Sequence, residues 1–247
     1  MKRWFKIEIE YDGGNFHGWQ TQPGKRTVQG DIEKAIETFT HTKVTVHGAG
    51  RTDAGVHAKG QVGSFCLIDC SLPPEKILSA LNALTGEDIT IHKIEEIPQP
   101  FYARKGIIAK IYRYSIDNNR YPSPLLRKTH FHVSKPLDLN KMKECEKYLL
   151  GTHDFTAFSA SDSTDPNPVK TITECSVKSE KNEIFIDIKG TGFLKNMVRI
   201  IAGTLIYAGM CKIEPEKIAQ ILQSRSRALA GPTAPPHGLT LLKVIYE

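Results

Sequence analysis

The chain has 247 residues, of which 40% are apolar and 24% charged, a composition that suits one large or two small globular domains. The formal net charge of +6 allows a polyanionic partner without requiring one. The five cysteines form no CxxC pair, which argues against a disulfide framework and a cysteine zinc site. The first residues lack the apolar segment of a signal peptide, so we expect a cytoplasmic protein rather than a secreted one.

The first part of the chain alternates predicted strands and helices. Apolar and polar residues alternate over residues 4–11, the period of a half-buried strand, and a glycine-rich loop follows. Apolar residues at helical spacing then predict a helix from Val28 to Phe39, with Thr27 as its N-cap. Further strands are predicted at 43–48, 61–68 and 88–94, and a second helix starts at Pro73. This β-α-β-β-α-β order is ferredoxin-like.

The second part again mixes strands and helices. Extended stretches are predicted at 106–116, 172–178, 183–190 and 238–247, and helices end at Gly151, run from 194 to 208 and open at Pro215. An irregular loop occupies 159–170. We therefore expect two α/β halves that share one sheet, with domains at 1–105 and 106–247.

One loop carries an isolated carboxylate among small residues. "GAGRTDAGVHA", residues 48–58, follows a predicted strand and places Asp53 among glycines and alanines, which give a large ligand access to the backbone. Asp53 then suits a nucleophile, a general base or a metal ligand. On loop chemistry alone, an Asx-turn is the commoner reason for such an aspartate, and Arg51 is more often a solvated cation than a partner of Asp53 or of a phosphate.

Two other segments carry side chains suited to chemistry. In "KIYRYSI" the strand period puts Tyr112 and Tyr114 on one face, where they are core residues or a platform on which a base stacks. In "GFLKNMVR" the spacing of Lys195 and Arg199 predicts two cations on one edge of a helix. They are solvated rim residues or point into a cleft, where an arginine can hold a carboxylate.

These segments, taken in order, resemble one enzyme family. "GRTDAGVHA", then "FYAR" with "KIYRY", then "GFLKNMVR", together with "EYDGGNFHGWQTQ" near the start and "HGLTLLKV" near the end, closely resemble the tRNA pseudouridine synthase A family over nearly the whole chain. The resemblance implies an α+β pseudouridine synthase fold: two ferredoxin-like halves that share a mainly antiparallel sheet, with the active site in the cleft between them.

The resemblance also implies roles and partners. The family converts uridine to pseudouridine at positions 38, 39 and 40 in the anticodon stem-loop of tRNA, as a homodimer without metal or organic cofactor. By resemblance, Asp53 is the catalytic aspartate, Tyr112 contacts the target base, Arg199 is the partner of the aspartate, and Arg51 helps to displace the nucleotide. We expect Lys25, Arg26 and Lys195 to contact phosphates because the chain is basic.

Alternatives remain open at this point. A catalytically silent tRNA-binding or folding protein is the main one, and a carboxylate-metal nuclease is another, disfavoured because no second acidic ligand lies near Asp53 in sequence. Asp162 and Asp165, in the irregular loop, are weaker candidates for the nucleophile because nothing glycine-rich or cationic frames them.

Overall fold

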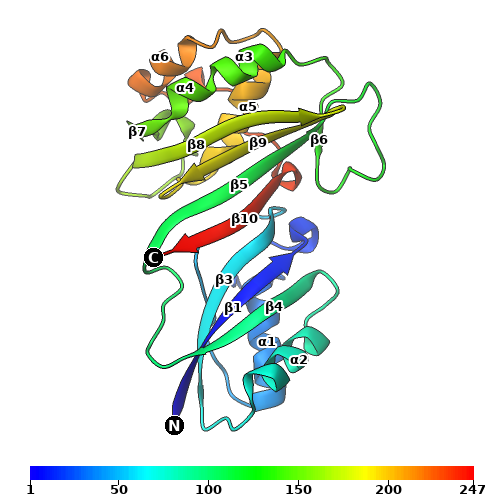
Figure 1. The fold of residues 1–247 in the computed structure, drawn as a ribbon, viewed down its shortest axis with the longest axis vertical. Coiled ribbons are helices and arrows are strands. Elements are labelled where there is room, and N and C mark those ends of the chain that lie inside the picture. The colour runs from blue at the N-terminus through cyan, green and yellow to red at the C-terminus, as the bar shows by residue number, and fades with distance from the viewer. The chain divides into compact units, whose positions relative to one another are not determined.

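The computed structural model describes residues 1–247 and contains two compact units (Figure 1). The first consists of Met1–Ile108 and Leu241–Glu247, and the second of Ala109–Thr240. The sequence places the division between residues 105 and 106, whereas the packing divides the chain after Ile108 and assigns the last residues to the first unit. None of the helices is both long enough and apolar enough to cross a lipid bilayer.

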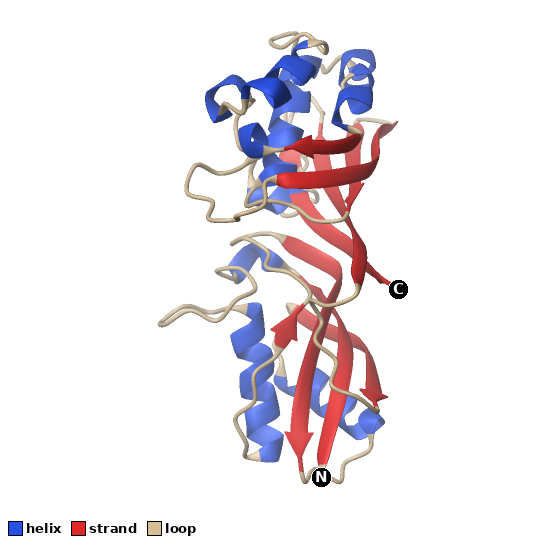
Figure 2. Cartoon of the chain, turned by 90° about the vertical axis from the view of Figure 1, so that its left-hand side faces the viewer, coloured by secondary structure: helices blue, strands red, loops and turns tan.

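The first unit has a mainly antiparallel sheet beside two helices. Its strands are β1 (Lys2–Tyr11), β2 (His47–Gly48), β3 (His57–Ile68), β4 (Ile89–Ile97) and β10 (Leu239–Tyr246), and its helices are α1 (Val28–Thr40) and α2 (Pro74–Leu84), with the short 3-10 helix η1 (Gly13–Asn15). The strand order is β4-β1-β3-β10, and β2 pairs with β3. Figure 2 shows α1 running alongside the strands.

The core of the first unit follows the predicted periodicity. The inward residues of β1, Phe5, Ile7 and Ile9, are fully buried, and Phe5 pairs with and stacks on Phe65 of β3. Ile32 of α1 and Ile77 of α2 are also fully buried. Burial of such side chains contributes about 1.5–3 kcal/mol each, so these contacts fix the sheet that leads into the Asp53 loop.

The predicted strand at 43–48 is wrong over most of its length. Only His47–Gly48 pair with β3. The backbone N–H of Val46, which is buried, instead donates to a carboxylate oxygen of Glu33 on α1, at 2.9 Å. The side chain of a helix residue thus takes the place of a strand partner.

The second unit has a sheet with helices packed on it. Its strands are β5 (Ile107–Asp117), β6 (Phe131–His132), β7 (Gly151–Asp154), β8 (Val169–Glu180) and β9 (Glu183–Gly190), and its helices are α3 (Leu139–Glu144), α4 (Glu146–Leu149), α5 (Met197–Gly209) and α6 (Lys217–Ser224). Short 3-10 helices η2 (Thr156–Phe158), η3 (Arg227–Leu229) and η4 (Pro236–Gly238) connect them. The strand order is β5-β9-β8-β7, with β6 parallel to β5 and the other pairs antiparallel.

The helix α5 is the centre of the second unit. It is buried along almost its whole length, including Ile200, Ile201 and Leu205, so its sequence is apolar on nearly every face. The predicted α+β class with a mainly antiparallel sheet is confirmed. The elements that carry the candidate site residues are therefore anchored in two well-packed cores.

Candidate active site

The Asp53 loop ends in a tight turn. The N–H of Val56 donates to the carbonyl of Asp53 at 3.1 Å, and Gly55, the third residue of the turn, has φ +78°. A four-residue turn with positive φ at its third position is a type II turn, which strongly favours glycine there. One glycine of the motif is thus explained by the turn that directs the chain from Asp53 into β3.

Polar side chains buried beneath the loop fix it on both sides of Arg51. The hydroxyl of Tyr11 on β1 lies 2.8 Å from that of Thr52, and the amide of Gln61 on β3 donates to the carbonyl of Gly50 at 2.9 Å. Tyr11, Thr52 and Gln61 are all buried. Burial raises the pKa of Tyr11 to about 12, so its phenol stays protonated and can hydrogen-bond to Thr52.

The segment that follows β1 supports the same loop through its backbone. The N–H of Trp19 donates to the carbonyl of Thr52 at 3.1 Å, and the N–H of Gly13 donates to Nδ1 of the buried His57 at 3.0 Å. Arg104, in the quoted "FYAR", donates from Nε to the carbonyl of Gly48 at 3.3 Å. These motifs are far apart in the sequence, and their convergence on one loop is visible only in the folded chain.

Asp53 and Arg51 differ in exposure within this frame. The side chain of Asp53 is half-buried, whereas Arg51 is exposed. The hydrogen bonds to the neighbouring residues fix the backbone that carries the Asp53 carboxylate, so this group is preorganised. The exposed Arg51 nearby is accessible to a polyanion. The local structure therefore suits the roles that the sequence resemblance implies for both residues.

Tyr112 lies on β5 in the second unit, opposite Ile188 of β9. Its ring meets the ring of Phe193 edge to face, with centroids 5.1 Å apart and planes at 82°. The tyrosine is 8% exposed, whereas Tyr114 is fully buried and donates from its hydroxyl to the carbonyl of Pro235. Tyr114 is a core residue, and Phe193, which sequence analysis missed, fixes the orientation of Tyr112.

Arg199 lies in the first turn of α5, and two contacts orient its guanidinium. Nε donates to the carbonyl of Ala234 at 2.8 Å, and Nη1 donates to the side-chain oxygen of Asn196 at 2.9 Å. Asn196 directly precedes the helix and has φ +61°, a left-handed conformation that asparagine tolerates better than most residues. These contacts within the second unit help to orient the guanidinium.

The predicted helical pairing of Lys195 with Arg199 is wrong. The helix begins at Met197 rather than 194, because Asn196 has a left-handed backbone, so Lys195 lies outside it. Its ammonium forms an ion pair with Asp162 at 2.7 Å, and Asp165 pairs with Lys170 at 3.2 Å. The charges of the acidic loop at 159–170 are therefore balanced by nearby lysines of the same unit.

Arg26 and Lys25 differ in their surroundings. Arg26 donates to both carboxylate oxygens of Asp88 at 2.7 Å and to Asp31 at 2.9 Å, and its guanidinium lies 4.3 Å from the centre of the Phe16 ring. These contacts favour a structural role for Arg26. Both residues are exposed, but the guanidinium of Arg26 is already paired with Asp88 and Asp31, so Lys25 is the better candidate of the two for a phosphate contact.

The candidate residues are distributed over both units. Asp53, Arg51, Lys25 and Arg26 belong to the first, and Tyr112, Lys195 and Arg199 to the second. The approach of Asp53 to Tyr112 and Arg199 stays a prediction. No group of three or more histidine, cysteine, aspartate and glutamate side chains is arranged to hold a metal ion.

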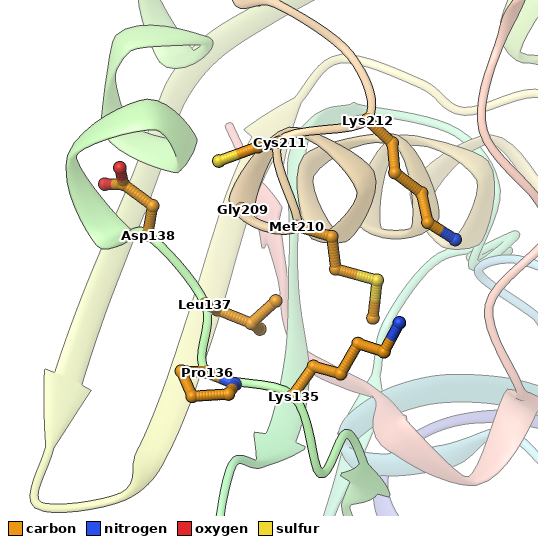
Figure 3. A pocket seen from close by; sticks show the side chains of 8 residues that line it. All are labelled: Lys135, Pro136, Leu137, Asp138, Gly209, Met210, Cys211 and Lys212. Atoms are coloured by element: carbon orange, nitrogen blue, oxygen red, sulfur yellow. The ribbon is translucent and has the colours of Figure 1, made fainter.

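A pocket of about 370 Å³ opens in the second unit at the C-terminal end of α5. Residues 135–138 and 209–212 line it (Figure 3). Arg199 lies at the other end of the helix. None of the predicted site residues lines this pocket, so it does not bear on their roles.

Comparison with known proteins identifies the family. A family model described as tRNA pseudouridine synthase matches residues 7–104 and 146–247, which include Asp53 and Arg199 but not Tyr112. The tRNA pseudouridine synthase A of Acetivibrio thermocellus is 47% identical over 241 residues, and that of Bacillus subtilis is 43% identical over 244, each alignment covering 98% of both chains. The tRNA pseudouridine synthase A 2 of Clostridium tetani is 45% identical over the full length of both. The chain belongs to the tRNA pseudouridine synthase family, and the predicted isomerase class and pseudouridine synthase fold are confirmed.

Proposed function

We propose that this enzyme converts uridine to pseudouridine at positions 38, 39 and 40 in the anticodon stem-loop of tRNA, with Asp53 as its nucleophile. The observation that carries the proposal is the Asp53 loop itself. It holds the aspartate of the family motif on a backbone fixed by Tyr11, Gln61 and Trp19. Binding of RNA alone has no need for a carboxylate held in this way, which disfavours the catalytically silent alternative.

The reaction is an isomerisation. The bond between N1 and C1′ of the uridine breaks, the uracil turns, and a bond forms between C5 and C1′. The C5 proton is lost and N1 gains a proton, so no net atom or electron is added. A carboxylate suits this chemistry as a nucleophile at C1′ or C6, or as a base at C2′, and all three fit Asp53.

Each of the other candidate residues has a physical role in this proposal. Arg199 offers a positive charge that can hydrogen-bond to the carboxylate of Asp53. Tyr112 stacks on the target uracil, and Arg51 helps to displace the nucleotide from its stem, which costs a few kcal/mol. Lys25 contacts phosphates. Lys195 does so after exchanging its partner Asp162 for the RNA.

The proposal extends to assembly and location. The enzyme acts as a homodimer in the cytoplasm. The full-length similarity to the tRNA pseudouridine synthases of Acetivibrio thermocellus and Clostridium tetani supports the same substrate class.

The test is the release of tritium from tRNA labelled at C5 of uridine. Asp53→Asn removes the negative charge with almost no change in shape, so release should fall by at least about 1,000-fold while affinity for tRNA stays within about threefold of wild type. The matched controls are Asp162→Asn and Asp165→Asn, which remove the other two candidate carboxylates one at a time and should retain turnover.

Two outcomes would contradict the proposal. If Asp53→Asn retains turnover and Asp162→Asn or Asp165→Asn loses it, the nucleophile is an aspartate of the irregular loop and not Asp53. Wild-type protein that binds tRNA and releases no tritium would support the silent binding protein instead.

A further inference from the structure

A long irregular loop in the second unit has no role in the proposed reaction. Residues 118–130 connect β5 to β6 without a helix or strand and form the green loop beside the label β6 in Figure 1. We refer to these residues as the β5–β6 loop. Connections longer than about 12 residues without regular structure are uncommon in compact domains, and those that are ordered are usually functional.

The base of the loop is fixed by a buried carboxylate. Asp117, at the end of β5, is 2% exposed and accepts hydrogen bonds from the backbone of Asn119 at 3.1 Å and of Ser123 at 2.8 Å. The side chain of Asn182 donates to that of Asn119 at 2.8 Å, which ties the loop to the β8–β9 turn. Buried, hydrogen-bonded anchors of this kind limit the motion of the backbone.

The far part of the loop is also ordered. The N–H groups of Thr129 and His130 both donate to the carbonyl of Leu126 at 2.9 Å. The ring of His132, just after the loop, hydrogen-bonds to the carbonyl of Asn119 at 2.9 Å. The loop thus presents its outer side chains from a defined backbone, so less conformational entropy is lost when a partner binds.

The outer side chains are apolar, aromatic or cationic. Leu125 is 90% exposed and Tyr121 is 73% exposed. Three exposed cations accompany them, Arg120, Arg127 and Lys128, and residues 118–130 include no acidic residue. The guanidinium of Arg120 lies 5.5 Å from the centre of the Tyr121 ring. The loop therefore offers a partner exposed apolar and aromatic side chains together with positive charge.

We propose that the β5–β6 loop is a second contact surface for tRNA, away from the reacting uridine. Tyr121 stacks on an unpaired base, and Arg120, Arg127 and Lys128 contact phosphates. Charge complementarity selects RNA over a second copy of the chain, because a symmetric contact between two such loops would bring cations against cations. The proposal rests on the proposed function for the identity of the RNA, and the binding itself needs no chemistry.

The first test removes the charge. In Arg120→Gln/Arg127→Gln/Lys128→Gln, the dissociation constant for full-length tRNA should rise about tenfold or more near physiological salt. The slope of log affinity against log salt should become shallower by about 2 to 3, because each phosphate contact contributes about 0.7 to 0.9. Tritium release at saturating tRNA should stay within about twofold of wild type. The matched control is Lys143→Gln/Lys147→Gln/Lys217→Gln, three exposed lysines of helices in the same unit, which should bind tRNA like wild type.

The second test isolates the ring. Tyr121→Ala should weaken tRNA binding about fivefold or more, and Tyr121→Phe, which keeps the aromatic face, should bind within about twofold of wild type. Tyr121 is 73% exposed, so neither substitution should change the melting temperature, and this measurement separates a folding defect from a binding defect.

Three outcomes would overturn the proposal. The first is an unchanged tRNA affinity and salt slope in Arg120→Gln/Arg127→Gln/Lys128→Gln. The second is equal tRNA binding by Tyr121→Ala and Tyr121→Phe. The third is a shift of the triple variant or of Tyr121→Ala from dimer to monomer in size-exclusion chromatography without a change in tRNA affinity. The last outcome would assign the loop to a contact between copies. Failure of the proposed function has a different signature, the absence of tritium release by wild-type protein.

Discussion

The side-chain hydroxyl of Thr52, the neighbour of Asp53, contacts the hydroxyl of Tyr11, and the removal of this contact can be tested. Tyr11 reaches it from β1 with 2.8 Å between the two oxygens, and both side chains are buried. Tyr11→Phe leaves the Thr52 hydroxyl without this partner, which costs about 1–3 kcal/mol when the group stays dry. We expect that loss in the free energy of unfolding measured with urea.

The same variant should separate turnover from binding. Tyr11 lies beneath the loop, so Tyr11→Phe should lower kcat for tritium release and change KM for tRNA by less than about twofold. Tyr121→Phe, at an exposed position, is the control and should change neither stability nor kcat. If the two variants behave alike, the Tyr11–Thr52 contact does not position Asp53.

At this scale, sequence patterns single out some candidate site residues and hide others. Asp53 stands out because its motif is rich in glycine. Phe193 and Asn196 lie inside a quoted motif, but their roles depend on an edge-to-face ring contact and a left-handed backbone, which residue spacing does not encode. The mistaken pairing of Lys195 has the same cause, since that backbone delays the start of α5.

The helix α5 depends on one close approach of the backbone. A Cβ built on Gly203 would lie 1.8 Å from the carbonyl oxygen of Pro232, so the segment around Pro232 packs directly on the helix. The same segment provides Ala234, whose carbonyl accepts the Nε–H of Arg199. Glycine within a helix costs about 1 kcal/mol relative to alanine, and here it permits this contact.

Gly203→Ala should therefore destabilise the protein despite the better helix propensity of alanine. Overpacking of a rigid interior costs about 1–3 kcal/mol, and displacement of Ala234 should also lower turnover because Arg199 loses an orienting contact. The measurements are urea unfolding and tritium release. Gly192→Ala is the control, because its Cβ would lie 3.6 Å from the nearest atom. An equally stable and active Gly203→Ala would refute the close approach.

Elements with a strong hydrophobic period were predictable. β1 and α1 form where the alternation and the helical spacing place them. Most of the predicted strand at 43–48 fails because Glu33, on a helix packed nearby in space, captures the N–H of Val46. Local propensity does not include such tertiary competition.

At the scale of the whole molecule, buried thiol and phenol groups lead us to expect that the free energy of unfolding falls at alkaline pH. Burial raises the pKa of the Cys145 and Cys175 thiols from 9.0 to about 12 and that of the Tyr11 phenol from 10.0 to about 12. In the unfolded chain these groups ionise near their ordinary values while the folded protein keeps them protonated. The stability they contribute is fully present below pH 9 and is lost as the pH rises toward 12.

Urea unfolding at pH 8, 9 and 10 tests this expectation. Above pH 9, each buried thiol should lower the free energy of unfolding by up to about 1.4 kcal/mol per pH unit. Cys175→Ala should reduce the steepness, and Cys211→Ser, at an exposed thiol, should leave it unchanged. A free energy of unfolding that is flat between pH 8 and 10 would be inconsistent with buried, protonated thiols.

The division of the chain was only partly accessible to sequence analysis. Pattern and spacing locate strands and helices, whereas assignment of the last strand to a unit depends on contacts with residues more than a hundred positions earlier. The hydroxyl of Tyr246 donates to the carbonyl of Ala103 at 2.6 Å, and the carbonyl of Leu242 lies against Gly60 of β3. Neither contact leaves a local signature.

That return of the chain has a consequence for biosynthesis. A ribosome releases Leu241–Glu247 only after it has made every residue of the second unit, yet these residues complete the sheet of the first. Until then, the nascent first unit exposes the part of the β3 edge that β2 does not cover, and another extended chain can pair with it. The first unit is translated first, yet its sheet is completed only when the last residues of the chain have been made. A prematurely terminated chain therefore lacks the strand that covers this edge.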